Sequence, residues 1–272
     1  MTYNEQFGQL SVVGIGPGDD CFIAPAAHAV LQKADSIAGY SKYIQLVKHL
    51  IGNKDIIQTG MTGEIERVRA AIDAAQTGKH VALISSGDAG VYGMLSLVYQ
   101  VLEEMGWTEG NNPNLEVIPG ISAVNSCAAL SGSPLGDDYC CISLSDLLTP
   151  WDSIRKKIRL AAEADFVIGF YNPASKRRRA QIAEAREILL NSRLDTTPVA
   201  LITSAYRNAQ KVVITDIEHF LEFEIGMNTT VIIGSSQTYV FDNKLVTPRG
   251  YSNKYSWDGE IIEGQQRGVS LK

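Results

Sequence analysis

The sequence predicts an α/β protein built from two domains. Short apolar runs, typical of buried parallel strands, alternate with stretches in which apolar residues recur at helical spacing. A stretch rich in Ser, Gly, Pro and Asp at 131–138 separates two such sets, which indicates a linker. We therefore expect an N-terminal α/β domain with Gly-rich loops over 1–134, a C-terminal α/β domain over 135–250 and a polar tail over 251–272.

The first half opens with a buried strand over 10–14, where an apolar run meets a glycine loop. Apolar residues at Ala27, Val30, Leu31 and Ala34 then follow the i, i+3, i+4, i+7 spacing of a helix. The same criteria predict further strands at 36–39, 80–86 and 115–118 and further helices at 65–75, 94–105 and 122–130. This order favours a mostly parallel sheet with helices on both faces.

The alternation continues after the linker. Strands are expected at 139–144, 165–171, 199–203, 212–215 and 229–234, and helices at 151–164 and 174–191. From residue 251 the chain is polar and aperiodic, as expected for a tail.

Composition and charge argue against several functional classes. The net charge of −6 disfavours an extended nucleic-acid surface. No apolar run approaches the ~20 residues of a membrane helix, and the N-terminus lacks a signal-peptide layout. The cysteines form no C-x-x-C and the histidines no metal-ligand spacing. We expect a cytoplasmic protein with reduced thiols and no metal, membrane or nucleic-acid partner.

Three glycine-containing loops, 14–19, 86–93 and 119–123, follow expected strands. Because the carboxyl ends of parallel strands share one edge of a sheet, these loops should converge on a ligand. Pro17 removes an N–H that a pyrophosphate needs, and the second strand ends at Gly39-Tyr40 without the carboxylate of a dinucleotide site. The loops therefore favour a nucleoside that lacks phosphates.

In sequence order, these loops resemble those of the tetrapyrrole methylase family. The matching segments are Gly14-Ile15-Gly16-Pro17-Gly18-Asp19, Ser86-Gly87-Asp88 and Pro119-Gly120-Ile121-Ser122-Ala123. The second half is similar to the branch of that family that methylates carbon 17 of precorrin-3B in cobalamin biosynthesis. That similarity lies in 170–177, in Ile233-Gly234-Ser235-Ser236-Gln237-Thr238 and in Thr247-Pro248-Arg249-Gly250-Tyr251.

The resemblance implies two α/β domains with S-adenosylmethionine (SAM) in a cleft between them, S-adenosylhomocysteine as a product, a tetrapyrrole substrate and a homodimer. It also implies cofactor contacts, residue by residue. In the first domain these are Pro17, Ser86, Gly87, Asp88, Val91, Ser122 and Ala123. Asn172, Ala205 and Thr230 would hold the adenine from the second domain.

The branch also implies contraction of the macrocycle, which needs acid–base help. Asp19, at the end of the first loop, is our candidate for that help, although it is equally suited to capping the loop. The basic run 176–179 suits substrate carboxylates, a solvated face or an RNA phosphate. Whether the substrate carries cobalt stays open. The alternative functions are another branch of the tetrapyrrole methylase family, a regulatory SAM- or nucleotide-binding module, and a methyltransferase acting on RNA or protein.

Overall fold

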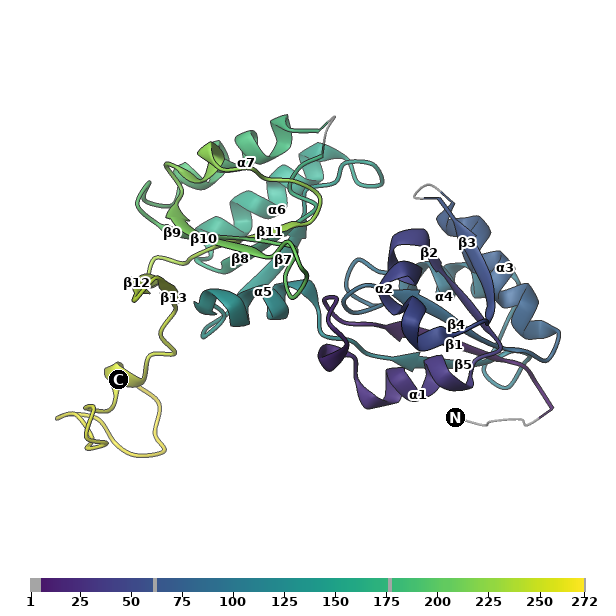
Figure 1. Cartoon of the computed structure of the whole chain (residues 1–272). Helices are drawn as coiled ribbons and strands as arrows, with labels where there is room; N and C mark the ends of the chain where they lie inside the picture. Colours follow the sequence, from purple (N-terminus) through teal and green to yellow (C-terminus); the bar gives the residue numbers. More distant parts are fainter. Residues whose placement is uncertain (1–5, 61–62, 176–177, 272) are drawn as a thin grey trace. The chain divides into compact units, whose positions relative to one another are not determined.

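The chain divides into two compact units, each with its own sheet (Figure 1). The computed structural model describes residues 6–60, 63–175 and 178–271. Unit 1 comprises the chain up to Ser126 together with Ala205–Asn208, and unit 2 comprises the rest. The division thus lies inside the helix that precedes the expected linker, and one short segment from late in the chain belongs to the first unit.

Unit 1 is a parallel sheet with the strand order β3-β2-β4-β1-β5. Its strands are β1 (Gln9–Gly14), β2 (Ser36–Tyr40), β3 (Asp55–Thr59), β4 (His80–Ser85) and β5 (Asn114–Ile118). The expected parallel arrangement is confirmed. Every crossover between these strands includes at least one helix, which is how parallel strands are joined.

Helices cover both faces of this sheet. They are α1 (Pro25–Lys33), α2 (Ser41–Ile51), α3 (Glu64–Gln76) and α4 (Leu95–Glu104). Buried residues of α1 and α2 form one apolar cluster with Val13 and Ile37. Those of α3 and α4 form another with Val12 and Leu83. Because neighbouring strand residues point to opposite faces, Val12 and Val13 belong to different clusters.

Unit 2 is built around a mixed sheet with the order β10-β9-β11-β8-β7. Its strands are β7 (Tyr139–Ser143), β8 (Val167–Tyr171), β9 (Pro198–Thr203), β10 (Lys211–Asp216) and β11 (Thr229–Ile233). Strand β7 is parallel to β8, whereas β11 is antiparallel to both β8 and β9. The core contains residues of α6 (Trp151–Glu163) and α7 (Ala180–Leu190) packed around Phe170 and Phe220.

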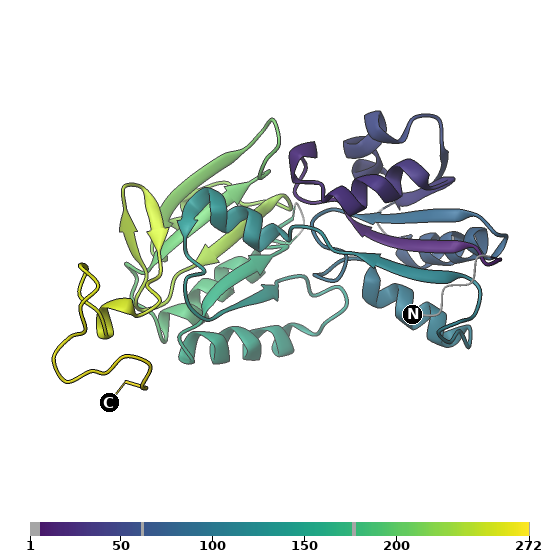
Figure 2. The same cartoon turned by 90° about the horizontal axis from the view of Figure 1, so that it is seen from below.

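A smaller sheet and one more helix complete unit 2. Helix α5 (Ala123–Ser131) leads into β6 (Gly132–Ser133), which pairs with β13 (Lys244–Val246) of the hairpin that β13 forms with β12 (Tyr239–Phe241). Figure 2 shows this hairpin in yellow beside the teal helix. No helix among the described residues is both long and apolar enough to span a bilayer.

Helix α7 begins later than expected. The sequence favours a helix from 174, but the described residues before Ala180 form a loop. Ser175 and Arg178 exchange backbone hydrogen bonds of 2.9 and 3.3 Å, and Asn172 takes a φ of 49°. These bonds satisfy the backbone groups of Ser175 and Arg178 outside a helix, and the helix starts only at Ala180. Lys176 and Arg177 lie outside the described residues.

Candidate functional site

The site is built at the carboxyl edge of the unit 1 sheet. Strands β4, β1 and β5 are neighbours, so the loops that follow them lie side by side. Gly16 and Gly87 form an antiparallel bridge between the first two loops. Gly16 N donates to Gly87 O at 3.1 Å, and Gly87 N donates to Gly16 O at 2.7 Å. The convergence expected from the sequence is therefore present.

Glycine is required where the three loops meet. A Cβ on Gly14 would lie 2.6 Å from Gly120 N and 2.7 Å from Gly87 O. A Cβ on Gly120 would lie only 2.2 Å from Gly87 O. These neighbours are backbone atoms and cannot swing aside, so the close approach of the loops excludes a side chain at either glycine.

Asp88 joins the second loop to the third. Its Oδ1 accepts a hydrogen bond from Gly90 N at 2.8 Å, and its Oδ2 accepts one from Gly120 N at 2.9 Å. Hydrogen bonds from backbone N–H groups to a carboxylate are among the stronger kinds. Each oxygen keeps a further lone pair for a ligand.

Arg207 joins the first loop to the second. Its Nε donates to Pro17 O at 2.7 Å, and its Nη2 donates to Ser86 Oγ at 2.9 Å. Pro17 and Ser86 were selected from the sequence, but Arg207 was not, because a single arginine in a loop far along the chain carries no local signal. It lies in the segment Ala205–Asn208, which belongs to unit 1.

The other unit 1 residues selected from the sequence flank these loops. Val91 is 37% exposed in the loop after β4. Ser122 and Ala123 lie at the start of α5, where the N–H groups of a first helical turn have no partner inside the helix. Ala205 lies in unit 1 beside Tyr206, whose ring packs on Phe22 with a centroid distance of 4.1 Å.

Asp19 caps a short turn directly after the first loop. Its Oδ1 accepts a hydrogen bond from Cys21 N at 3.0 Å. The hydrogen bonds from Cys21 hold the pKa of the exposed Asp19 carboxyl below its ordinary value. The structure thus shows the capping contact, and a carboxyl with a lowered pKa is ionised at neutral pH.

The remaining predicted contacts lie at one edge of the unit 2 sheet. Asn172 follows the carboxyl end of β8, and the antiparallel register of β11, in which Val231 pairs with Phe170, brings Thr230 to the same edge. Asn172 Nδ2 donates to Ser143 Oγ at 3.1 Å. Burial raises the pKa of the Cys127 thiol to about 11, while its hydrogen bond with Thr230 opposes the shift.

Arg178 uses its guanidinium to hold the backbone near the end of β8. Its Nη1 donates to Leu144 O and its Nη2 to Asn172 O, both at 2.7 Å. Within the basic run 176–179, the structure therefore gives Arg178 a role in holding the backbone around Asn172. Arg179 is exposed.

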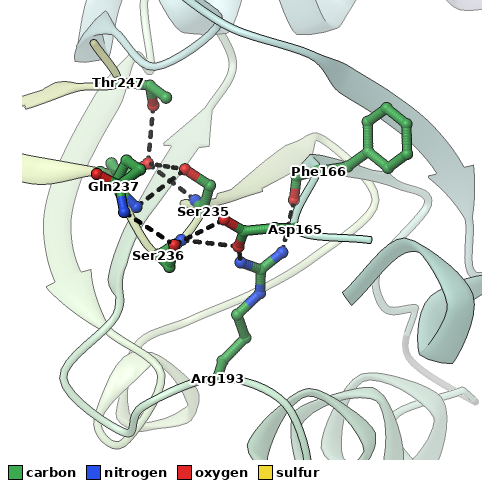
Figure 3. Close-up of polar contacts among 8 residues, drawn as sticks. Asp165, Phe166, Arg193, Ser235, Ser236, Gln237 and Thr247 are labelled. Carbon is green, nitrogen blue, oxygen red and sulfur yellow. Dashed lines mark hydrogen bonds and ion pairs between the residues drawn. The ribbon is translucent and has the colours of Figure 1, made fainter. Parts of the chain in front are cut away.

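The motif 233–238, which carries part of the family resemblance, forms a network at the opposite end of the strands of this sheet, as Figure 3 shows. Asp165, which precedes β8, accepts from Ser236 N at 2.9 Å and from Ser236 Oγ at 2.6 Å, and it pairs with Arg193. The Thr238 and Thr247 hydroxyls lie 2.7 Å apart. These residues connect loops at the amino end of β8, away from Asn172 and Thr230.

No cluster of His, Cys, Asp or Glu that could hold a metal occurs within the part of the chain that the structure describes. The four cysteines all lie in the described part of the chain, and none of them forms a disulfide. Burial raises the pKa of Cys140, as of Cys127, to about 11, which leaves little thiolate at neutral pH.

Residues 9–221 match the family model of the Tetrapyrrole (Corrin/Porphyrin) Methylases. The chain belongs to this family. A tetrapyrrole methylase fold agrees with the expected α/β class, and the resemblance drawn from the glycine loops is confirmed.

Individual tetrapyrrole methylases match closely. The chain is 53% identical over 92% of its length to the cobalt-factor III methyltransferase of Priestia megaterium, but it spans only 46% of that protein. It is 46% identical to the probable cobalt-factor III C(17)-methyltransferase of Salmonella typhimurium, with 89% of this chain and 99% of the relative covered. The solved structure of the methyltransferase CobJ is 31% identical, with a TM-score of 0.82 over 89% of this chain and 100% of that one.

Proposed function

We propose that this tetrapyrrole methylase uses SAM to methylate carbon 17 of precorrin-3B or of its cobalt counterpart, and that it contracts the macrocycle in cobalamin biosynthesis. The observation that carries the proposal is the similarity to the probable cobalt-factor III C(17)-methyltransferase of Salmonella typhimurium. The chain is 46% identical to this relative over 99% of the relative's length. The three-loop edge of unit 1 supports it, because it offers backbone and polar groups suited to an amino acid and a nucleoside.

The residues present fit SAM. Gly14, Gly16, Gly87 and Gly120 let the backbones of the three loops approach one another closely. We propose that Pro17, Ser86, Gly87, Asp88 and Val91 contact the amino-acid side of the cofactor. Asp88 offers its remaining lone pairs to the ammonium group, while Ser122 and Ala123 present the N–H groups and the positive end of α5 to the carboxylate.

We assign the adenine to Asn172, Ala205 and Thr230. Asn172 suits backbone recognition, because its positive φ of 49° turns the chain sharply after β8 and Arg178 fixes its carbonyl. The same kind of turn follows β9, where Ser204 has a φ of 51° next to Ala205. Backbone N–H and C=O groups held in this way can form hydrogen bonds with the edge of a purine, and no charged side chain is needed.

When bound, SAM supplies a methyl group already activated by its positive sulfur. The protein's task is then to hold the acceptor carbon in line with that methyl, and positioning of this kind can supply ~7–11 kcal/mol. The junction of the three loops serves this purpose, because it would hold SAM in place before the tetrapyrrole binds.

Asp19 remains our proposed group for acid–base help during ring contraction. Asp19 is ionised at neutral pH, so it can accept a proton but cannot donate one, and its lowered pKa makes it a weaker acceptor than an ordinary carboxylate. We expect Asp19→Asn to bind SAM normally and to slow product formation about tenfold or more. An assay of SAM affinity and turnover separates these effects, and unchanged turnover would leave Asp19 with the capping role alone.

The basic run is proposed to bind substrate carboxylates through Arg179, because Arg178 already donates to two carbonyls. The finer expectations of a homodimer and of a cytoplasmic location rest on the family resemblance and on composition. The mass of the purified protein by analytical ultracentrifugation tests the first.

The decisive assay incubates the protein with SAM and either precorrin-3B or its cobalt counterpart. We expect the mass of one of these substrates to rise by one methyl group, with a change in absorbance as the macrocycle contracts. The substrate that reacts identifies the route. Tight SAM binding without methyl transfer to either would favour a regulatory module, and methyl transfer to RNA or protein would replace the proposal.

A further inference from the structure

Arg207 lies where the two cofactor loops that carry Pro17 and Ser86 meet. We propose that Arg207 is a positioning residue that locks these loops together and thereby sets the affinity for SAM. The inference rests on the proposed function for its ligand, but the lock itself is a property of unit 1 without any ligand.

The guanidinium makes one hydrogen bond to each loop. Nε donates to Pro17 O at 2.7 Å and Nη2 to Ser86 Oγ at 2.9 Å. These two nitrogens belong to one rigid planar fork, so fixing one bond also fixes the other. A lysine ammonium has no such fork and cannot hold both acceptors in this geometry.

The charge of Arg207 stays available to the site. Among the described residues no carboxylate forms an ion pair with it, and its partners are a carbonyl and a hydroxyl. Burial lowers the pKa of Arg207, and the neighbouring Tyr43 phenol opposes this shift. A partly buried cation with neutral partners leaves a positive potential beside the loops, and this potential favours a ligand that carries a carboxylate.

The first loop makes room for this side chain. A Cβ on Gly18 would lie 2.6 Å from Arg207 Nε and 2.7 Å from its Cγ. Any other residue at this position would push the guanidinium away from Pro17. Next to Arg207, Tyr206 packs on Phe22 and anchors the segment on the same loop region.

The first test compares Arg207→Gln and Arg207→Lys with Arg186→Gln. Arg186 is the matched control, because it also donates to backbone carbonyls, Ile217 O at 2.8 Å and Glu218 O at 3.1 Å, but in unit 2. Calorimetry of SAM binding should show a rise in Kd of about tenfold or more for Arg207→Gln, a smaller rise for Arg207→Lys and none for Arg186→Gln. A folded Arg207→Gln protein that binds SAM as the wild type does would overturn the proposal.

Hydrogen–deuterium exchange without ligand tests the lock separately. Backbone amides of 14–18 and 85–90 should exchange faster in Arg207→Gln than in the wild type, and no faster in Arg186→Gln. If the wild type binds no SAM, the proposed function fails, and the exchange result still decides whether Arg207 holds the loops. Unchanged exchange in Arg207→Gln rejects the lock.

A second perturbation reaches Arg207 without changing it. Gly18→Ala should weaken SAM binding as Arg207→Gln does, because the added methyl group displaces the guanidinium. Gly78→Ala is the control for backbone strain, since Gly78 also has a positive φ, +94°, but a Cβ there meets nothing within 4 Å. Equal SAM affinities for these two variants contradict the role assigned to Arg207.

Discussion

At the scale of single residues, unit 1 holds a polar group inside its sheet. Ser11, fully buried on β1, donates to Glu116 Oε2 at 2.7 Å and lies 2.9 Å from His80 Nε2. If Ser11 uses its only proton for Glu116, then the bond to His80 requires that Nε2 of His80 carries a hydrogen and donates it. The neutral tautomer with hydrogen on Nε2 meets this requirement.

The pKa of His80 leads to a prediction. Burial lowers it from the ordinary value of 6.5, although Glu116 and Asp35 oppose the shift and Lys33 and Lys54 add to it. Neutral His80 therefore contributes stability that is present above the unfolded-state pKa and is lost as the pH falls through the lower folded-state pKa. We expect the free energy of unfolding to decrease between about pH 7.5 and about pH 5.

Urea denaturation at the two pH values measures this effect. His80→Gln keeps an amide donor near Ser11 but does not titrate, so its stability should change less with pH. Equal pH dependence in the two proteins would show that other groups dominate.

The sequence selected many of the residues at the site but not their interactions. Ser86, Gly87 and Asp88 follow a strand at a motif that can be recognised locally. The bond of Asp88 to Gly120, and those of Arg207 to Pro17 and Ser86, join segments from different parts of the chain. Such pairings depend on strand order, which hydrophobic periodicity does not encode.

At the scale of elements, strands β1, β2 and β4 of the first sheet follow the apolar runs because they are buried on both faces. The opening strand, β4 and β5 lie close to where the sequence places them. The sequence does not predict strand β3, because this strand has exposed residues, including Ile56 at 40%, and lacks a continuous buried run. It does not predict helix α2 either, although Ile44, Val47 and Ile51 bury one face of that helix.

The meeting of three loops predicts a sharp effect of one methyl group. Gly120→Ala should lower the free energy of unfolding by at least about 2 kcal/mol, because its Cβ would collide with Gly87 O. It should also abolish SAM binding, since the loops must separate. Chemical denaturation and calorimetry measure the two effects.

Gly226→Ala is the matched control for this substitution. Gly226 has no positive φ, and an added Cβ would meet nothing within 4 Å. We expect it to behave as the wild type in both measurements. A Gly120→Ala protein as stable as Gly226→Ala would mean that the loops can move apart at little cost.

At the scale of the whole molecule, the chain forms two units with separate cores. One is parallel throughout, whereas the other mixes parallel and antiparallel pairs although its sequence shows a similar alternation of strands and helices. Strand direction depends on which strands become neighbours. In unit 2, β11 enters between β8 and β9 and reverses the pairing on both of its sides.

By itself, the sequence determined the α/β class, most of the buried strands, the three glycine loops and, through them, the family. These properties are local, because they depend on the spacing of apolar residues and on where glycine permits tight backbone turns. Only the tertiary structure decided that Ala205–Asn208 belongs to unit 1, that Asp88 and Arg207 tie the loops together, and that the motif 233–238 supports the far edge of the second sheet. Each of these contacts joins residues distant in sequence, and they meet only once the order of the strands is set.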